Sequence, residues 1–195
     1  MNTKRFKVML SLALSGAVAA VAAFATAQIS DDILLIAQPA DHDVYAARRE
    51  VNVRTTIDGD FVAAGQRVMV DGVVTGDVIV AAQIIEIRSE VRDDVRAAGQ
   101  HVRVTSPVAG HIVAAGQVIT VSEQVGDFAR LTGNTVDISG NVGGDLKIRA
   151  RKITINATVD GNAELIGDEL RLGPNARMRG EVRWRSDNDA TIDSG

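Results

Sequence analysis

The sequence predicts an all-β fold, a β-solenoid of about eight coils that repeat at a period of roughly seventeen. One phrase recurs three times, as FVAAGQRVMV at Phe61, VRAAGQHVRV at Val95 and IVAAGQVITV at Ile112. Apolar residues keep the same places in every repeat, and a glycine followed by a polar residue closes most repeats. A fixed repeat period of this kind is typical of a solenoid, in which successive units stack along one axis.

Eight complete repeat units can be aligned between residues 44 and 181, and a ninth, incomplete unit follows them. The units begin at Val44, Phe61, Val78, Val95, Ile112, Phe128, Leu146, Ala163 and Val182. The lengths of the eight complete units, in chain order, are 17, 17, 17, 17, 16, 18, 17 and 19. The alignment therefore predicts a period of about seventeen with single-residue slips.

Four positions of the unit are apolar throughout, and their spacing predicts strands. Position 8 is filled by Val51, Val68, Ile85, Val102, Ile119, Val136, Ile153 and Leu170. Positions 1, 10 and 14 are equally apolar, whereas position 9 is mostly polar. This alternation indicates strands with one buried face. A single unit cannot bury its apolar side chains alone, so each coil must stack on the next, with about three short strands in each.

Small residues mark the corners of the predicted coil. Position 16 is glycine in all units but one, and position 17 is usually aspartate. Glycine permits unusual φ angles and aspartate can hydrogen-bond to nearby backbone, so we expect a corner there. The Ala-Ala-Gly at positions 3 to 5 predicts a second corner.

The two ends of the chain differ from the repeats. Residues 1–27 combine a basic start, an apolar stretch and the sequence Ala25-Thr26-Ala27, which predicts a signal peptide cut after Ala27 and a periplasmic or secreted protein. An uncleaved membrane anchor is the alternative. Residues 28–43 are expected to form an N-terminal cap on the solenoid of residues 44–185, because Leu34, Ile36 and Ala40 fit positions 8, 10 and 14. The polar residues 186–195 are expected to be disordered.

Composition narrows the classes of partner. Without residues 1–27 the chain has 18 Lys+Arg and 25 Asp+Glu, a net charge of −7, which disfavours nucleic acid and anionic membrane surfaces as partners. There is no cysteine, so neither a disulfide nor a lipid-modified N-terminal cysteine is expected. The sequence has no phosphate-binding loop and no hydrolase or metalloprotease motif, so we expect no nucleotide, no cofactor and no enzymatic activity.

The polar column at position 17 has two interpretations. In the alignment it reads Asp60, Asp77, Asp94, His111, Asp127, Asp145, Asn162 and Glu181. A row of carboxylates could bind Ca²⁺, but a turn residue repeated with the turn is the simpler explanation. His42, His101 and His111 are expected to be solvated surface residues rather than a metal site, because they occupy different positions of the coil.

Units of about this length close with V-x-G-D, as in Val74-Thr75-Gly76-Asp77 and Val142-Gly143-Gly144-Asp145, and continue with Phe/Val-x-Ala-Ala and an I-x-I strand. In this pattern the chain resembles the bactofilins, a family of polymer-forming bacterial cytoskeletal proteins. The resemblance covers about residues 44–185. It implies a right-handed β-helix with a triangular core that assembles end to end without nucleotide and serves as a scaffold. Bactofilins are cytoplasmic, whereas this chain begins with a predicted signal peptide, so an exported relative is expected.

The sequence leaves two functions open. The favoured hypothesis is a non-enzymatic scaffold of the bacterial envelope that binds itself, with peptidoglycan or envelope proteins as further partners. The alternative is a β-helix that binds or modifies envelope carbohydrate. For self-association the sequence suggests the C-terminal end, with Val182 and Trp184, and a lateral patch of Val62, Ile79 and Val113.

Overall fold

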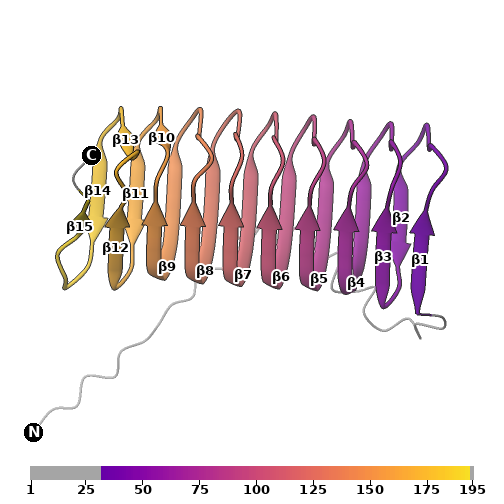
Figure 1. Cartoon of the computed structure of the whole chain (residues 1–195), viewed down its shortest axis with the longest axis horizontal. Coiled ribbons are helices and arrows are strands. Elements are labelled where there is room, and N and C mark those ends of the chain that lie inside the picture. The colour runs from indigo at the N-terminus through magenta and orange to yellow at the C-terminus, as the bar shows by residue number, and fades with distance from the viewer. Residues whose placement is uncertain (1–31, 194–195) are drawn as a thin grey trace, which may run out of the picture.

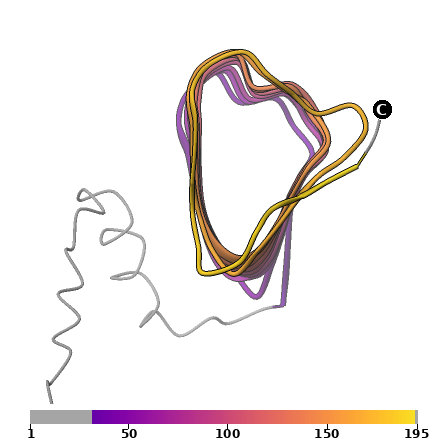
Figure 2. The same cartoon turned by 90° about the vertical axis from the view of Figure 1, so that its left-hand side faces the viewer.

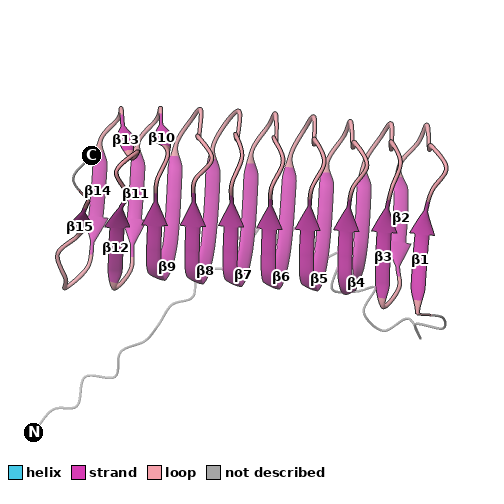
Figure 3. Ribbon diagram, in the orientation of Figure 1, coloured by secondary structure: helices cyan, strands magenta, loops and turns pink. Residues whose placement is uncertain are grey.

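The computed structural model describes residues 32–193, and these residues form strands and turns with no helix (Figure 3). The predicted signal peptide and its cleavage site after Ala27 lie outside the described residues. No helix of the described part is long and apolar enough to span a membrane. The all-β prediction is therefore confirmed for residues 32–193.

The strands stack into a rod that winds with a right-handed sense. In chain order they are β1 (Ile33–Ile36), β2 (Val44–Ala47), β3 (Glu50–Val53), β4 (Phe61–Val70), β5 (Val78–Ile87), β6 (Val95–Val104), β7 (Ile112–Val121), β8 (Ala129–Ile138), β9 (Leu146–Ile155), β10 (Thr158–Val159), β11 (Ala163–Ile166), β12 (Glu169–Leu172), β13 (Arg177–Met178), β14 (Val182–Arg185) and β15 (Thr191–Ile192). In Figure 1 the chain runs up the front, over the top and down the back while it advances from right to left. That winding is right-handed, as parallel crossovers almost always are. Seen down the axis, the coils superimpose on a roughly triangular outline (Figure 2).

The coil length is more regular than the alignment predicted. Every strand pair is parallel, and position 1 passes from Ile112 to Ala129 and then to Leu146 at a constant interval of seventeen. The unit predicted to begin at Phe128 begins at Ala129 instead, so the predicted single-residue slips on either side of it are wrong. Among the complete coils, only the one from Ala163 to Glu181 departs from the period, and it is longer by two.

The core consists of inward-facing columns that run along the rod. Positions 1, 3, 8, 10 and 14 of the central coils are buried almost completely, as Ile85, Ile87 and Val91 illustrate with an exposed fraction of 0%. The alternation of buried and less buried residues along β4 to β9 matches the period of two that predicts these strands. Each coil therefore contributes side chains to the same hydrophobic core as its neighbours.

The corners differ in detail from the prediction. Each of the strands β4 to β9 passes through a bend at position 6, where the pairing is interrupted, for example at Gln66 and Gln83. This second corner lies just beyond the Ala-Ala-Gly at positions 3 to 5. From Ala40 to Val159 the third side makes a single bridge per coil at position 14, such as Val91 to Val108, and near the C-terminal end it forms the two-residue strand pair β10 and β13.

Most glycines at position 16 serve close packing and not an unusual φ. Gly59 has a φ of +152°, and no other glycine of the described residues has a positive φ. A Cβ on Gly76 would lie 2.3 Å from Asp60 Oδ1 and 2.8 Å from the backbone of Gly59. Adjacent coils approach too closely there for a side chain without a backbone shift.

Both ends of the rod are covered in part. β1 pairs with β3 so that Leu34 lies beside Val51 and Ile36 beside Val53, and both side chains pack on the core. The prediction of a disordered tail is wrong as far as Asp193. The tail returns to the rod as β15, which pairs with β12, and the backbone N–H of Asp193 donates to Leu172 O at 2.9 Å.

Candidate functional site

The residues predicted for lateral self-association are only partly brought together. Val62 and Ile79 are neighbours in the outward column at position 2, but Arg96 separates them from Val113. Tyr45, which the sequence did not suggest, extends the pair on its other side and is 70% exposed. The apolar patch is therefore Tyr45, Val62 and Ile79, at the N-terminal end of the rod.

The large exposed apolar side chains gather at the two ends of the rod. Within the described residues they are Ile33, Leu35, Tyr45, Val182 and Ile192. The first three lie in the first two coils and the last two in the final coil (Figure 1). The ends, rather than the middle of the rod, therefore offer apolar surface to a partner.

Trp184 has a different role from the one predicted. Its side chain lies in the inward column above Leu165 and packs on the core, and its Nε1–H donates to Asn188 O at 3.0 Å. The Trp184 side chain therefore covers the C-terminal end of the core and does not offer a free apolar surface to a partner. Val182, in the same strand, is 40% exposed. The N-terminal end, with Ile33 and Leu35 at 62% and 50% exposed, is the more apolar of the two.

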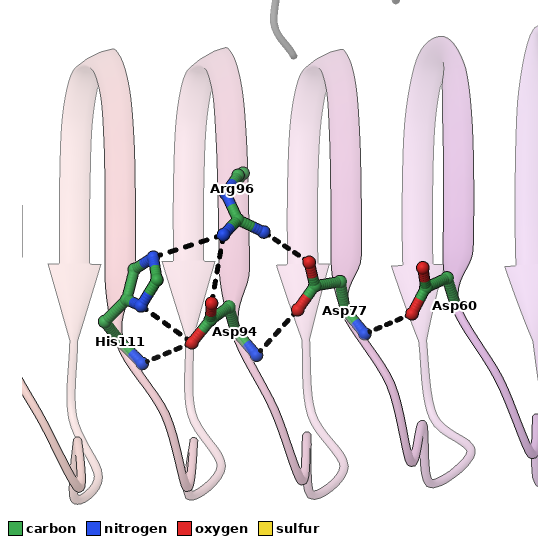
Figure 4. A network of polar contacts seen from close by, with 5 residues as sticks. All are labelled: Asp60, Asp77, Asp94, Arg96 and His111. Atoms are coloured by element: carbon green, nitrogen blue, oxygen red, sulfur yellow. Dashed lines mark hydrogen bonds and ion pairs between the residues drawn. The ribbon is translucent and has the colours of Figure 1, made fainter. Parts of the chain in front are cut away.

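Side chains at the position-17 corner bind the backbone of the following coil. The Oδ1 atom of Asp60 accepts a hydrogen bond from Asp77 N at 2.9 Å, and Asp77 does the same for Asp94 N at 3.2 Å (Figure 4). Four further contacts of this kind start at Asp43, Asp94, Asp145 and Asn162, at 2.8 to 3.0 Å. We name this row the corner ladder. It explains the aspartates as turn residues that satisfy backbone donors between coils.

Arg96 and His111 connect three coils beside the corner ladder. The Arg96 guanidinium contacts the Asp77 carboxylate, and its second nitrogen lies 3.0 Å from Asp94 Oδ2 (Figure 4). His111 Nδ1 lies 2.8 Å from Asp94 Oδ1, and the His111 side chain is only 18% exposed. The prediction that His111 is a solvated surface residue is therefore wrong. His42 and His101 are exposed, as predicted.

A carboxylate cluster forms where Asp93 occupies position 16. One oxygen of each of Asp77, Asp93 and Asp94 lies within 4.8 Å of the others. Asp77 and Asp94 already bind Arg96 and backbone N–H groups. Partial desolvation, together with the carboxylates of Asp77, Asp94 and Asp60, raises the pKa of Asp93 above its ordinary value of 3.8. These contacts favour a structural origin of the cluster over a Ca²⁺ site.

The Asp93→Asn variant is expected to be more stable than the wild type at pH 7. The raised pKa means that ionised Asp93 is disfavoured in the folded state, and this cost is complete above the folded pKa. It disappears below pH 3.8, where the carboxyl group is protonated in both states. Urea unfolding of both proteins between pH 3.5 and 8 checks this. Asp127→Asn, at the same position of another coil, is the control, and a gain that does not shrink at low pH would contradict the expectation.

The corner ladder is interrupted once, by an aromatic stack. Phe128 occupies the position-17 column that the alignment assigned to Asp127, because Phe128 O accepts from Ile112 N and Asp145 O accepts from Ala129 N. The Phe128 ring stacks on His111 with ring centroids 4.3 Å apart and 11° between planes. The Arg130 guanidinium carbon lies 4.6 Å from the Phe128 ring centroid.

A hollow of about 540 Å³ opens beside Phe128 and extends toward the C-terminal end. Its lining includes Phe128 and Arg130 together with two ion pairs, from Lys147 to Glu164 at 2.6 Å and from Arg183 to Glu181 at 3.0 Å. The hydrogen bond from Lys147 lowers the pKa of Glu164, and that from Arg183 lowers the pKa of Glu181. Sequence reasoning missed this site because its members come from different coils and lie far apart along the chain. Comparisons with protein-family models, with curated proteins and with solved structures find no match.

Proposed function

We propose that this protein is a non-enzymatic structural protein of the bacterial envelope that self-associates through the ends of its β-solenoid. The observation that carries the proposal is the position of the large exposed apolar side chains, which lie in the terminal coils within residues 32–193. Between the ends, the rod is a regular stack whose apolar columns face inward.

The strand edges at the ends support the same proposal. Among the described residues β1 pairs only with β3, and β2 pairs only with β4, so each leaves one edge of backbone N–H and C=O groups without a strand partner. β14 and β15 leave the opposite edges open at the other end. An unpaired edge is a template for another strand, and apolar side chains beside it add burial to the backbone hydrogen bonds.

The envelope location rests on the predicted signal peptide, and N-terminal sequencing that begins at Gln28 would support it. The bactofilin-like repeats favour a second copy of this chain as the first partner, with peptidoglycan or envelope proteins as candidates for what the assembly holds. The net charge of −7 of residues 28–195 argues against nucleic acid in that role.

Replacing Ile33 and Leu35 with lysine together is expected to abolish self-association of the mature protein. Both side chains point outward from β1, so the fold of the monomer is kept, while two positive charges replace the exposed apolar surface beside the open strand edge. Sedimentation velocity over a hundredfold range of concentration measures the effect, and circular dichroism verifies that the fold is kept.

Two variants assign the contact surface in the same experiment. Ile192→Lys tests the C-terminal end, because Ile192 is 72% exposed on β15 whereas Trp184 packs on the core. The Val62→Lys, Ile79→Lys double variant tests the lateral patch. A wild-type protein that stays monomeric at all concentrations would refute self-assembly. Assembly that survives the β1 variant but fails in one of the others would move the contact to that surface.

A further inference from the structure

Phe128, together with His111 in the preceding coil, breaks the corner ladder. At the corner ladder an aspartate or asparagine normally accepts a backbone hydrogen bond from the next coil, as Asp145 does for Asn162 N at 2.8 Å. The Phe128 side chain has no atom that can accept a hydrogen bond from Asp145 N. Asp127 stands beside it at position 16, where glycine is the rule. Departures from a repeat that gather at one place, as His111, Asp127 and Phe128 do, are typical of a functional site, because they reduce local stability.

The stack formed around Phe128 holds a cation over the hollow. His111 and Arg130 both lie against the ring, at 4.3 and 4.6 Å from its centroid. Contact with the ring orients the guanidinium without consuming its hydrogen-bond donors. Arg130 is exposed and forms no ion pair within residues 32–193, unlike Lys147 and Arg183 in the same hollow. It is therefore available to bind an external carboxylate through two parallel N–H donors.

The rest of the hollow presents both hydrogen-bond donors and hydrogen-bond acceptors along the rod. The outward column at position 2 reads Arg130, Lys147, Glu164 and Arg183, and the adjacent corner column reads Asp145, Asn162 and Glu181. The four coils span about 14 Å at the usual strand spacing. Hydroxyl groups both donate and accept, so a chain of sugar hydroxyls matches this lining, whereas an apolar peptide side chain does not.

From this geometry we propose that the hollow beside Phe128 binds a short oligosaccharide that carries a carboxylate, with Arg130 as the carboxylate-binding residue. Lys147, Arg183 and Asn162 donate to the sugar hydroxyls, and Glu164 and Glu181 accept from them. The site lies on the side of the rod, far from β1 and β2, and it reaches Arg183 in β14 at the C-terminal end. Its binding is therefore measured on protein that does not assemble.

Isothermal titration with maltotrionate, which carries one terminal carboxylate, and with neutral maltotriose tests this site. The titration uses the Ile33→Lys, Leu35→Lys variant so that assembly plays no part. We expect maltotrionate to bind at least tenfold more tightly than maltotriose. Arg130→Gln should weaken binding of maltotrionate at least tenfold, because the charge-assisted hydrogen bonds to the carboxylate are lost.

Two further variants separate binding from folding and from unspecific charge. Phe128→Asn restores the ladder acceptor that Asn162 provides at the same position, so it should unfold at a temperature close to that of the wild type while losing the binding of maltotrionate. Arg103→Gln removes an exposed arginine from a different column and should bind like the wild type. The proposal is overturned if neither sugar binds at millimolar concentration, if both bind equally well, or if Arg103→Gln weakens binding as much as Arg130→Gln.

Discussion

Replacing Ile119 with alanine is expected to lower the free energy of unfolding by about 2 to 5 kcal/mol. Ile119 has an exposed fraction of 0% and lies in the inward column between Val102 and Val136. Truncation leaves a cavity that those neighbours cannot fill, because the strands on both sides are held in register by their backbone pairing. Because each coil contacts only its two neighbours, the defect weakens both interfaces of one coil in the middle of the rod.

Urea unfolding followed by circular dichroism measures this loss. With a dependence of about 2 kcal/mol per molar urea, the midpoint should fall by roughly 1 to 2.5 M. Thr120→Ala is the matched control, since Thr120 is the next residue on the outward side of the same strand, and its effect should stay within about 0.5 kcal/mol. A loss below about 1 kcal/mol for Ile119→Ala would contradict the assignment of this column to the core.

Replacing Asp94 with alanine is expected to cost about 1.5 to 3 kcal/mol. The Asp94 carboxylate accepts from His111 N at 2.9 Å and contacts His111 Nδ1 at 2.8 Å and Arg96 at 3.0 Å. With a side chain only 15% exposed, Asp94 lies where water replaces these contacts incompletely. Alanine leaves the His111 N–H without its acceptor and leaves Arg96 with Asp77 as its remaining carboxylate partner.

Asparagine at the same position distinguishes the backbone contact from the ion pairs. Asp94→Asn keeps an Oδ1 acceptor for His111 N, as Asn162 does for Glu181 N at 3.0 Å, and should lose less than half of what alanine loses. Thermal and urea unfolding of the two variants provide the comparison. Equal losses would show that the charge, and not the coil-to-coil hydrogen bond, is what Asp94 contributes.

The register of one coil shows where reasoning from the sequence failed. Phe128 and Ala129 are both apolar and adjacent, so either can begin a unit, and the larger side chain is the one that hydrophobicity favours for the core. In the structure Ala129 is buried, at 1% exposed, and Phe128 turns outward against His111. The backbone pairing decides between them, because a one-residue slip would place every following side chain on the wrong face.

The sequence by itself determined the coil period, the inward columns and the N-terminal cap through Leu34 and Ile36, because these follow from hydrophobic alternation repeated at a nearly constant interval. Only the tertiary structure decided which outward residues meet. The contact of His111 with Asp94, the bridge from Arg96 to Asp77 and the hollow beside Phe128 join side chains from different coils. Their meeting depends on register and side-chain direction at the corner, which the strand pairing between coils sets and no local pattern encodes.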